Sequence, residues 1–221
     1  MTVPALVLDF GGPVLLTPFE LVEERTGTPI HALLHGRGPL ASPDDPDPVW
    51  QDLQAGRITE RDYWADRALQ WDREGGHGSD IRAMIAHLYE PPRPSLVREE
   101  ARRLVRDALA AGHPVGILTN DLHAFHSEEW VQQIEIVGDV DVVVDGSLEG
   151  HLKPDPRLYV LLSERLDVSF ADMVFLDDQA TNIRGAEALG IPSVLFDVTD
   201  PETSYAEVRK LLQLPEEDHD G

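Results

Sequence analysis

Five short apolar runs in this chain have the length and the Val, Ile and Leu content of buried strands. They cover residues 4–8, 115–118, 140–144, 173–176 and 192–196. The last four alternate with amphipathic, helix-like stretches over residues 96–111, 123–136, 155–166 and 181–189. Such alternation is typical of right-handed βαβ crossovers. The pattern predicts an α/β fold, a Rossmann-like parallel sheet with helices on both faces.

The ends of the helix over residues 96–111 carry recognisable signals. Ser95 is a good N-cap residue, and Gly112 is a typical stop. We therefore expect this helix to begin directly after Ser95.

Residues 15–94 differ, because no strand-like run interrupts them. Amphipathic helical patterns cover residues 19–25, 49–55, 60–70 and 79–88. Since this segment follows the first predicted strand, we expect an inserted α-helical cap over the carboxyl edge of the sheet. The predicted cap is residues 16–94, and the predicted core domain is residues 1–15 with 95–221. The aromatic side chains expected in the core of the cap are Trp50, Tyr63, Trp64 and Trp71.

The composition narrows the class of partner. The formal net charge of -23 disfavours nucleic acid and anionic membrane surfaces, so an anionic substrate needs local positive charge or a metal ion. The chain has no cysteine, which excludes disulfides and thiolate chemistry. With neither a signal-like leader nor an apolar span of about 18 residues, we expect a cytoplasmic protein that does not bind membranes. A homodimer is an open expectation. The acidic tail, residues 215–221, is expected to fray.

A carboxylate follows the first strand. Asp9 precedes Gly11 and Gly12, which allow a sharp turn and close approach to a ligand. It is a candidate nucleophile that forms an aspartyl-phosphate. The alternative is a carboxylate that only caps a turn.

Two adjacent carboxylates, Asp177 and Asp178, end another apolar run. Like charges at a strand end are costly unless a cation or hydrogen bonds offset them. Because Mg²⁺ prefers oxygen ligands, it is the expected counter-ion and cofactor. The alternative is helix N-capping by Asp178 or Thr181.

Three further polar residues suit an anionic group. Thr119 and Asn120 follow a strand and offer a hydroxyl and an amide to a phosphate. The chain has only two lysines, Lys153 and Lys210, and its other basic side chains are arginines. The compact charge of Lys153 suits a phosphoryl oxygen, although a solvated loop lysine is the alternative. Because parallel strands end at one edge, these segments should meet there.

Together the segments DFGG, LTN, LKPDP and FLDDQATNIRGAEALGI resemble the four motifs of the haloacid dehalogenase-like hydrolase superfamily. The resemblance covers nearly the whole chain, with residues 16–94 in the place of the helical cap. TNDLHAFH, KPDPRLY and LQAGRITERDYW are similar to the branch that includes α-D-glucose-1-phosphatase.

The resemblance implies catalytic roles for the matching residues. Asp9 would be the nucleophile and a Mg²⁺ ligand together with the Gly11 carbonyl and Asp178, with Asp177 beside them. Thr119, Asn120 and Lys153, with the Gly11–Gly12 turn, would bind the phosphoryl group. These assignments agree with the chemistry of the residues themselves.

Gly11 departs from the family pattern, in which most phosphatases carry an aspartate as the general acid and base. Losing such a group typically costs about 10²- to 10⁴-fold in rate. Three explanations are open: a substrate with a good leaving group, a substitute acid such as Asp121 or His123, or an inactive domain. His31 and His35 are four residues apart and are expected to be surface or packing histidines.

The predicted function is that of a Mg²⁺-dependent phosphatase acting on a small phosphorylated metabolite, with sugar phosphates as the first expectation. One alternative is a haloacid dehalogenase, in which Asp9 displaces halide from carbon. Another is a weak or inactive domain that binds a phosphometabolite or a partner protein.

Overall fold

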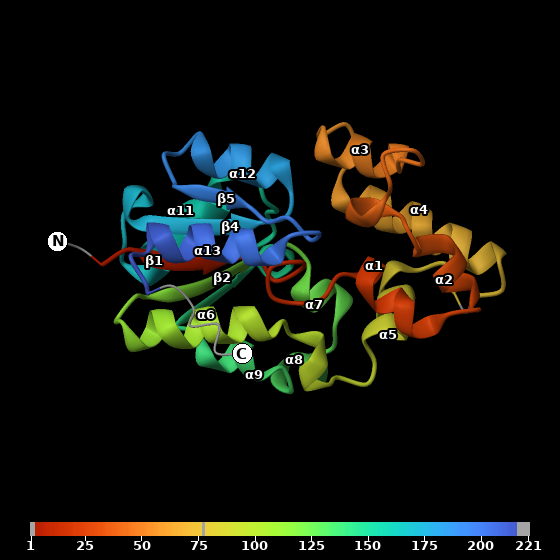
Figure 1. The fold of residues 1–221 in the computed structure, drawn as a ribbon, viewed down its shortest axis with the longest axis horizontal. Coiled ribbons are helices and arrows are strands. Elements are labelled where there is room, and N and C mark those ends of the chain that lie inside the picture. The colour runs from red at the N-terminus through yellow and green to blue at the C-terminus, as the bar shows by residue number, and fades with distance from the viewer. Residues whose placement is uncertain (1–2, 77, 216–221) are drawn as a thin grey trace.

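The sheet has five parallel strands in the order β3-β2-β1-β4-β5. The computed structural model describes residues 3–76 and 78–215, so most of the tail, residues 216–221, lies outside the described part. The predicted α/β fold with a parallel sheet is confirmed (Figure 1). The strands are β1 (Ala5–Leu8), β2 (Val115–Thr119), β3 (Val142–Asp145), β4 (Met173–Asp177) and β5 (Ser193–Leu195).

The strand order places β1 in the centre of the sheet. Leu8 pairs with Ile117 of β2 on one side and with Leu176 of β4 on the other. All residues of these three strands are buried, as expected for a sheet covered on both faces. This register brings the residues that follow β1, β2 and β4 to one edge.

Alternate residues of β1 point into two different apolar layers. Leu6 and Leu8 pack with residues of α6 and α13, whereas Ala5 and Val7 pack with residues of α11 and α12. The sheet is therefore a middle layer between two helical layers. The helices are α6 (Glu99–Ala110), α11 (Pro156–Leu166), α12 (Ala180–Glu187) and α13 (Pro201–Leu211).

Between β1 and β2 the described chain is helical. In Figure 1 these helices gather beside the carboxyl edge of the sheet, and we refer to α1 through α5 as the helical segment. The division into a cap of residues 16–94 and a core stays a prediction. The elements are α1 (Pro18–Leu21), η1 (Val22–Arg25), α2 (Pro29–Leu34), η2 (Gly38–Leu40), α3 (Pro48–Gln54), α4 (Glu60–Arg73), α5 (Ile81–Tyr89) and, after the segment, η3 (Pro94–Leu96).

The helical segment has a buried centre of its own. Tyr63, Trp64 and Trp71 are buried, as predicted, whereas Trp50 is partly exposed. Phe19 packs edge-on against Tyr63. These contacts hold α1, α3 and α4 together beside the sheet.

Two predicted helices differ from the structure. Ser95 does not cap α6, because it lies within the short helix η3 and the two residues after that helix, Val97 and Arg98, run extended beside the start of the helical segment. Leu15 forms a bridge with Val97 there, and Arg98 precedes the helix. The predicted stop after this helix is confirmed, since Gly112 has a φ of +84°.

The helix predicted over residues 123–136 is divided into three short ones. Ser127 begins a new helix by accepting a hydrogen bond from the Trp130 N–H. The sequence prediction did not include α2, α10 or α13. The remaining elements are α7 (Leu122–Phe125), α8 (Glu128–Gln132), α9 (Glu135–Asp139), α10 (Gly146–Glu149) and η4 (Phe170–Asp172).

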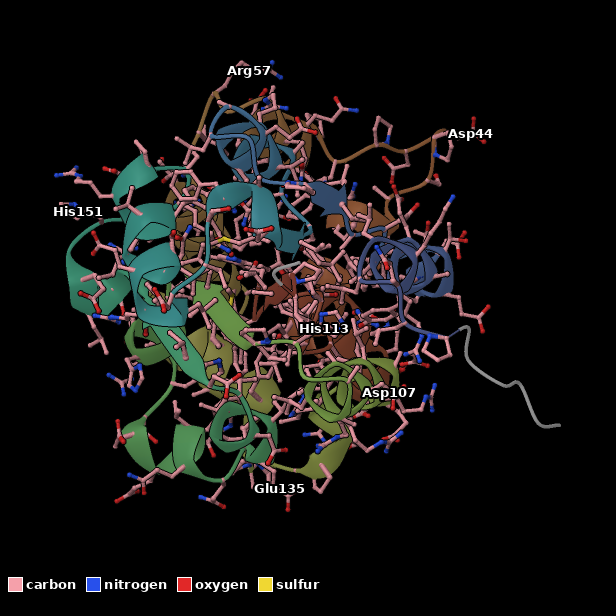
Figure 2. The ribbon with its side chains drawn as sticks, turned by 90° about the vertical axis from the view of Figure 1, so that its left-hand side faces the viewer. Asp44, Arg57, Asp107, His113, Glu135 and His151 are labelled. Atoms are coloured by element: carbon pink, nitrogen blue, oxygen red, sulfur yellow. The ribbon has the colours of Figure 1, made fainter. Side chains whose placement is uncertain are left out.

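The opposite edge of the sheet, where the strands begin, faces the viewer in Figure 2, with His113 near its centre. The His113 Nδ1 lies 2.7 Å from the Pro4 carbonyl oxygen.

Among residues 3–76 and 78–215, no helix combines the length and apolar character needed to cross a membrane.

Candidate active site

One buried lysine joins two of the predicted strand ends. The Lys153 Nζ lies 2.8 Å from Asp9 Oδ1 and 2.6 Å from Asp177 Oδ2, and its side chain is 1% exposed. Burial alone would lower the pKa of Lys153, but the Asp177 and Asp9 carboxylates outweigh it and hold that pKa above its ordinary value. Lys153 is therefore a charged group of this edge and not a solvated loop lysine.

Asn120 fixes the backbone at Lys153. Its Oδ1 accepts a hydrogen bond of 2.6 Å from the Lys153 N–H. The Asn120 amide thus connects the end of β2 with the loop before α11. Thr119, the last residue of β2, lines the same pocket as Asp9.

Asp177 is saturated with hydrogen bonds. Besides Lys153, it accepts from the Gln179 N–H at 2.8 Å and from the Asn182 Nδ2 at 3.1 Å. The alternative of helix N-capping by Asp178 or Thr181 is not found, since Gln179 occupies the N-cap position of α12. Asn182 was missed from the sequence, although it lies five residues after Asp177 on the first turn of that helix.

Asp178 differs from its neighbour, because no donor among the described residues bonds its carboxylate. A Cβ at Gly12, which has a φ of +84°, would lie 2.9 Å from Asp178 Oδ2. Only a glycine therefore lets the turn after β1 approach this carboxylate so closely. Gly11 lines the pocket beside it.

The three carboxylates have the composition and spacing of a cation site. Asp9, Asp177 and Asp178 each offer an oxygen, and these oxygens lie within 4.8 Å of one another. Burial raises the pKa of Asp9 to about 8 against the opposing effect of Lys153. Burial, with Asp177 and Asp9, also raises the pKa of Asp178. Three carboxyl groups share one ammonium here, and a divalent cation with oxygen ligands would offset their negative charge when they ionise.

The pocket above these groups has an apolar wall, to which the helical segment and the segments that follow the strands both contribute. Its polar floor includes Asp9, Thr119 and Asp178. The sheet side and the helical segment both contribute large apolar side chains. Those that surround the space include Phe10, Phe19, Trp50, Trp64, Ile85 and Phe125.

The helical segment also places a carboxyl group in the pocket. Glu60, the first residue of α4, accepts hydrogen bonds from the Gln179 Nε2 at 2.8 Å and the Trp64 Nε1 at 3.3 Å. Burial, and next the Asp121 carboxylate, raise the pKa of Glu60. The sequence analysis did not single out Glu60, although it lies within the phrase LQAGRITERDYW.

Polar contacts join the helical segment to the turn after β4. The Gln54 Nε2 donates to the Asp178 carbonyl at 3.3 Å, and its Oε1 accepts from the Ala180 N–H at 3.0 Å. In addition, Arg61 forms an ion pair with Asp121.

The two substitute acids expected from the sequence occupy different places. Asp121 lines the pocket, with Oδ1 bonded to Arg61 and a buried Oδ2 that has no hydrogen-bond partner among the described residues. His123 bonds Asp145 and Glu128 and is not among the residues that line the pocket.

The other predicted histidines lie elsewhere. His31 and His35 stack with ring centroids 4.7 Å apart, and His35 bonds the exposed Glu23. The three side chains could approach one ion, but they lie on the surface of the helical segment.

A family model described as haloacid dehalogenase-like hydrolase matches residues 19–190 of the chain. Acyl-CoA dehydrogenase family member 10 of Mus musculus is 37% identical over 106 residues, which are 48% of this chain and 10% of that protein. Phosphatase MT3486 of Mycobacterium tuberculosis is 37% identical over 59% of this chain and 55% of its own length. The matched part of this chain therefore spans about half the length of the phosphatase and a tenth of the length of the mouse protein. Sesquiterpene phosphatase astK of Aspergillus oryzae is 26% identical over 96% of this chain and 97% of that protein.

Solved structures share the architecture. The structure of YfnB from Bacillus subtilis bound to magnesium has a TM-score of 0.67 at 14% identity, covering 97% of this chain and 100% of that chain. A dehalogenase structure has a TM-score of 0.62 at 20% identity, covering 95% and 97%. At these identities the likeness establishes the fold alone.

Proposed function

Because the chain belongs to the haloacid dehalogenase-like hydrolase family, we propose that it is a Mg²⁺-dependent phosphatase that uses Asp9 as its nucleophile. One observation carries this proposal. Lys153 joins Asp9 to Asp177, while the adjacent Asp178 carboxylate has no bonded donor among the described residues. The proposed nucleophile and the Asp178 carboxylate thus line one pocket, and the Lys153 ammonium bonds that nucleophile directly.

Each floor residue has a proposed role. Mg²⁺ would be held by Asp9, Asp178 and the Gly11 carbonyl, with Asp177 beside it, and would offset the charge of the phosphoryl group. The Thr119 hydroxyl and the Lys153 ammonium would contact the phosphoryl oxygens. Asn120, which was expected to bind phosphate directly, is engaged with the Lys153 backbone and would act by positioning Lys153.

The reaction has two steps. An Asp9 carboxylate oxygen attacks phosphorus and the P–O bond to the organic group breaks, which leaves an aspartyl-phosphate and releases the alcohol after protonation. Water then attacks phosphorus, the bond to Asp9 breaks, and inorganic phosphate leaves. The buried Lys153 would keep the Asp9 carboxylate aligned in both steps.

The wall of the pocket supports an ester with an apolar organic group. Phe19, Trp50 and Trp64 offer aromatic surface and few hydrogen-bond partners to a sugar. The name of the relative astK, a sesquiterpene phosphatase, agrees with this substrate class. A sugar phosphate and the α-D-glucose-1-phosphatase branch stay predictions, as do a cytoplasmic location and a homodimer.

The alternatives make different demands on the site. Dehalogenation needs no metal, so the three clustered carboxylates favour phosphoryl transfer. A binding domain without turnover would retain Mg²⁺-dependent phosphate binding but release no product.

The test is phosphate release from an apolar alkyl phosphate, glucose 1-phosphate and an activated aryl phosphate, with Mg²⁺ and with EDTA. Asp9→Asn should abolish release, whereas Asp44→Asn, on the outer loop labelled in Figure 2, should not. Release that persists in Asp9→Asn would refute the mechanism. Halide release from a haloacid in EDTA, without phosphate release, would establish the dehalogenase alternative.

A further inference from the structure

The leaving alcohol needs a proton donor that the turn after β1 does not supply. When the P–O bond breaks, an alkyl ester would otherwise release an unstable alkoxide, so a positioned acid accelerates the step. Gly11 has no side chain, and a Cβ placed there would meet nothing within 4 Å. The donor must therefore come from another part of the pocket.

Most ionisable or hydroxylic groups of the pocket are engaged otherwise. Asp121 is held by Arg61, whose guanidinium donates to its Oδ1. The Tyr89 hydroxyl donates its proton to the Leu16 carbonyl at 2.7 Å. Burial lowers the pKa of His126 to about 3, which leaves its ring neutral near pH 7.

We propose, resting on the phosphatase function above, that Glu60 of the helical segment is the general acid and base of this site. Glu60 starts α4 and lines the pocket with Asp9 and Asp178. Each carboxyl oxygen of Glu60 accepts one hydrogen bond. The donors are the side-chain amide of Gln179, at the start of α12, and the indole N–H of Trp64, on the same helix as Glu60. The carboxyl is thus fixed in the pocket and aimed by side chains from two separate elements.

The local fold explains why Glu60 is held so firmly. Thr59 and Asp62 form a reciprocal capping box that fixes the first turn of α4. Position is therefore set by the backbone as well as by the two donors.

The charges around Glu60 favour its protonated form. The carboxylates of Asp121, Asp9 and Asp178 act on it from the sheet side, against Lys153 on the same side and Arg61 beside it on α4. Together with burial, this surplus of negative charge raises the pKa of Glu60. A carboxyl of this kind can hold a proton at a pH where an exposed glutamate has lost it.

The proton balance follows directly. As Asp9 attacks phosphorus, the Glu60 proton moves to the ester oxygen, the P–O bond breaks and the neutral alcohol leaves. The Glu60 carboxylate then accepts a proton from the water that attacks the aspartyl-phosphate. The bond from phosphorus to Asp9 breaks, inorganic phosphate leaves, and free Asp9 and protonated Glu60 are regenerated.

The experiment compares alkyl and activated aryl phosphates with wild type, Glu60→Gln and Asp9→Asn. In Glu60→Gln, alkyl phosphate turnover should fall by about 10²- to 10⁴-fold. The aryl ester, whose leaving group needs no proton, should lose less than about tenfold in its first step, measured as the burst of released phenol. The alkaline decline of kcat/KM that reports the acid should also disappear.

A second variant restores an acid by another route. The space at Gly11 is open, so an aspartate fits there. Gly11→Asp in the Glu60→Gln background should raise alkyl phosphate turnover by at least about tenfold, because the new carboxyl group supplies part of the lost proton transfer. Asp66→Asn, an exposed carboxylate further along α4, is the matched control and should not change the leaving-group dependence. Circular dichroism checks that each variant folds.

The outcomes separate the two proposals. Wild-type turnover that depends on Asp9, with equal losses on alkyl and aryl esters or no loss in Glu60→Gln, would overturn the role of Glu60 alone. Absence of turnover that depends on Asp9 in the wild type would overturn the phosphatase function and with it the acid.

Discussion

The Lys153 Nζ lies 2.8 Å from Oδ1 of Asp9, inside a site from which solvent is almost excluded. The same nitrogen reaches Asp177, so one cation serves the ends of two neighbouring strands, β1 and β4. Attraction between charges at this depth is strong because little water screens it. The ion pairs therefore matter for both the fold and the chemistry of the carboxylates.

Replacing Lys153 by Met should weaken the folded state and the reaction together. Two buried carboxylates would lose their shared partner, and the free energy of unfolding should fall by about 3–5 kcal/mol. Phosphate release should fall at least about 10²-fold. Urea unfolding and turnover measure the two effects. Lys210→Met, at the exposed second lysine, should change neither, and equal behaviour of the two variants would contradict the role of Lys153.

Asn120→Ala should act through the position of Lys153. The Lys153 N–H would lose its buried acceptor, so the free energy of unfolding should fall by about 1–3 kcal/mol. Turnover should fall while Mg²⁺ still binds, because the carboxylates that are proposed to bind the metal are unchanged. Gln132→Ala removes an exposed amide and should stay within about 0.5 kcal/mol of wild type. A loss of Mg²⁺ binding in Asn120→Ala would contradict this separation.

Mg²⁺ should stabilise the protein more at pH 8 than at pH 6. Burial raises the pKa of Asp9 to about 8, so the metal-free folded state holds a proton that the unfolded chain releases above about pH 4. Stability without metal therefore falls as pH rises from about 4 to 8, and the cation replaces the lost proton. At about 100 times its Kd, Mg²⁺ should raise Tm by roughly 5–10 °C.

Thermal unfolding with Mg²⁺ and with EDTA at both pH values measures this effect. Asp178→Asn should lose most of the shift. A shift that is equal in the variant, or larger at pH 6, would argue against cation binding at the three carboxylates.

His126 should make the fold sensitive to acid. Its ring stacks on Trp130 with centroids 3.8 Å apart, and burial, then the charges of Arg82 and His123, lower its pKa to about 3. An unfolded histidine titrates near about 6.5. The contribution of His126 to the free energy of unfolding is therefore complete above about pH 6.5. It is lost as the pH falls toward about 3, by at most about 1.4 kcal/mol per pH unit.

The matched variant is His126→Phe, which keeps an aromatic ring on Trp130 and removes the titration. Its free energy of unfolding should fall less steeply than that of wild type between pH 6.5 and about 4.5. Urea unfolding across this range measures the slopes, and parallel slopes would show that other groups control the acid response.

The sequence was sufficient to predict which strand ends meet. Asp9, Thr119 and Asp177 each follow an apolar run, and a parallel sheet necessarily brings such ends to one edge. The partners within the edge were not predictable, because they depend on side-chain directions across loops. Asn120 offers its amide to the Lys153 backbone, and Glu60 reaches the pocket from a helix 51 residues after Asp9 only through tertiary packing.

Local helix signals failed where tertiary contacts outweighed them. Ser95 has the right chemistry for an N-cap, yet Val97 pairs with Leu15 and Arg98 donates to the Gly12 carbonyl. These contacts keep Val97 and Arg98 extended, so that α6 begins only at Glu99. Ser127 shows the converse, since its cap interrupts a stretch whose periodicity had predicted one continuous helix.

Gln54 ties α3 to the turn between β4 and α12. Both ends of its amide bond the turn that carries Asp178, at the Asp178 carbonyl and the Ala180 N–H. These bonds are uncharged, so high salt should leave them largely intact while weakening the exposed ion pairs. A displacement of α3 would remove the acceptor of the Ala180 N–H and the donor to the Asp178 carbonyl, so the position of α3 and the backbone beside the Asp178 carboxylate are coupled.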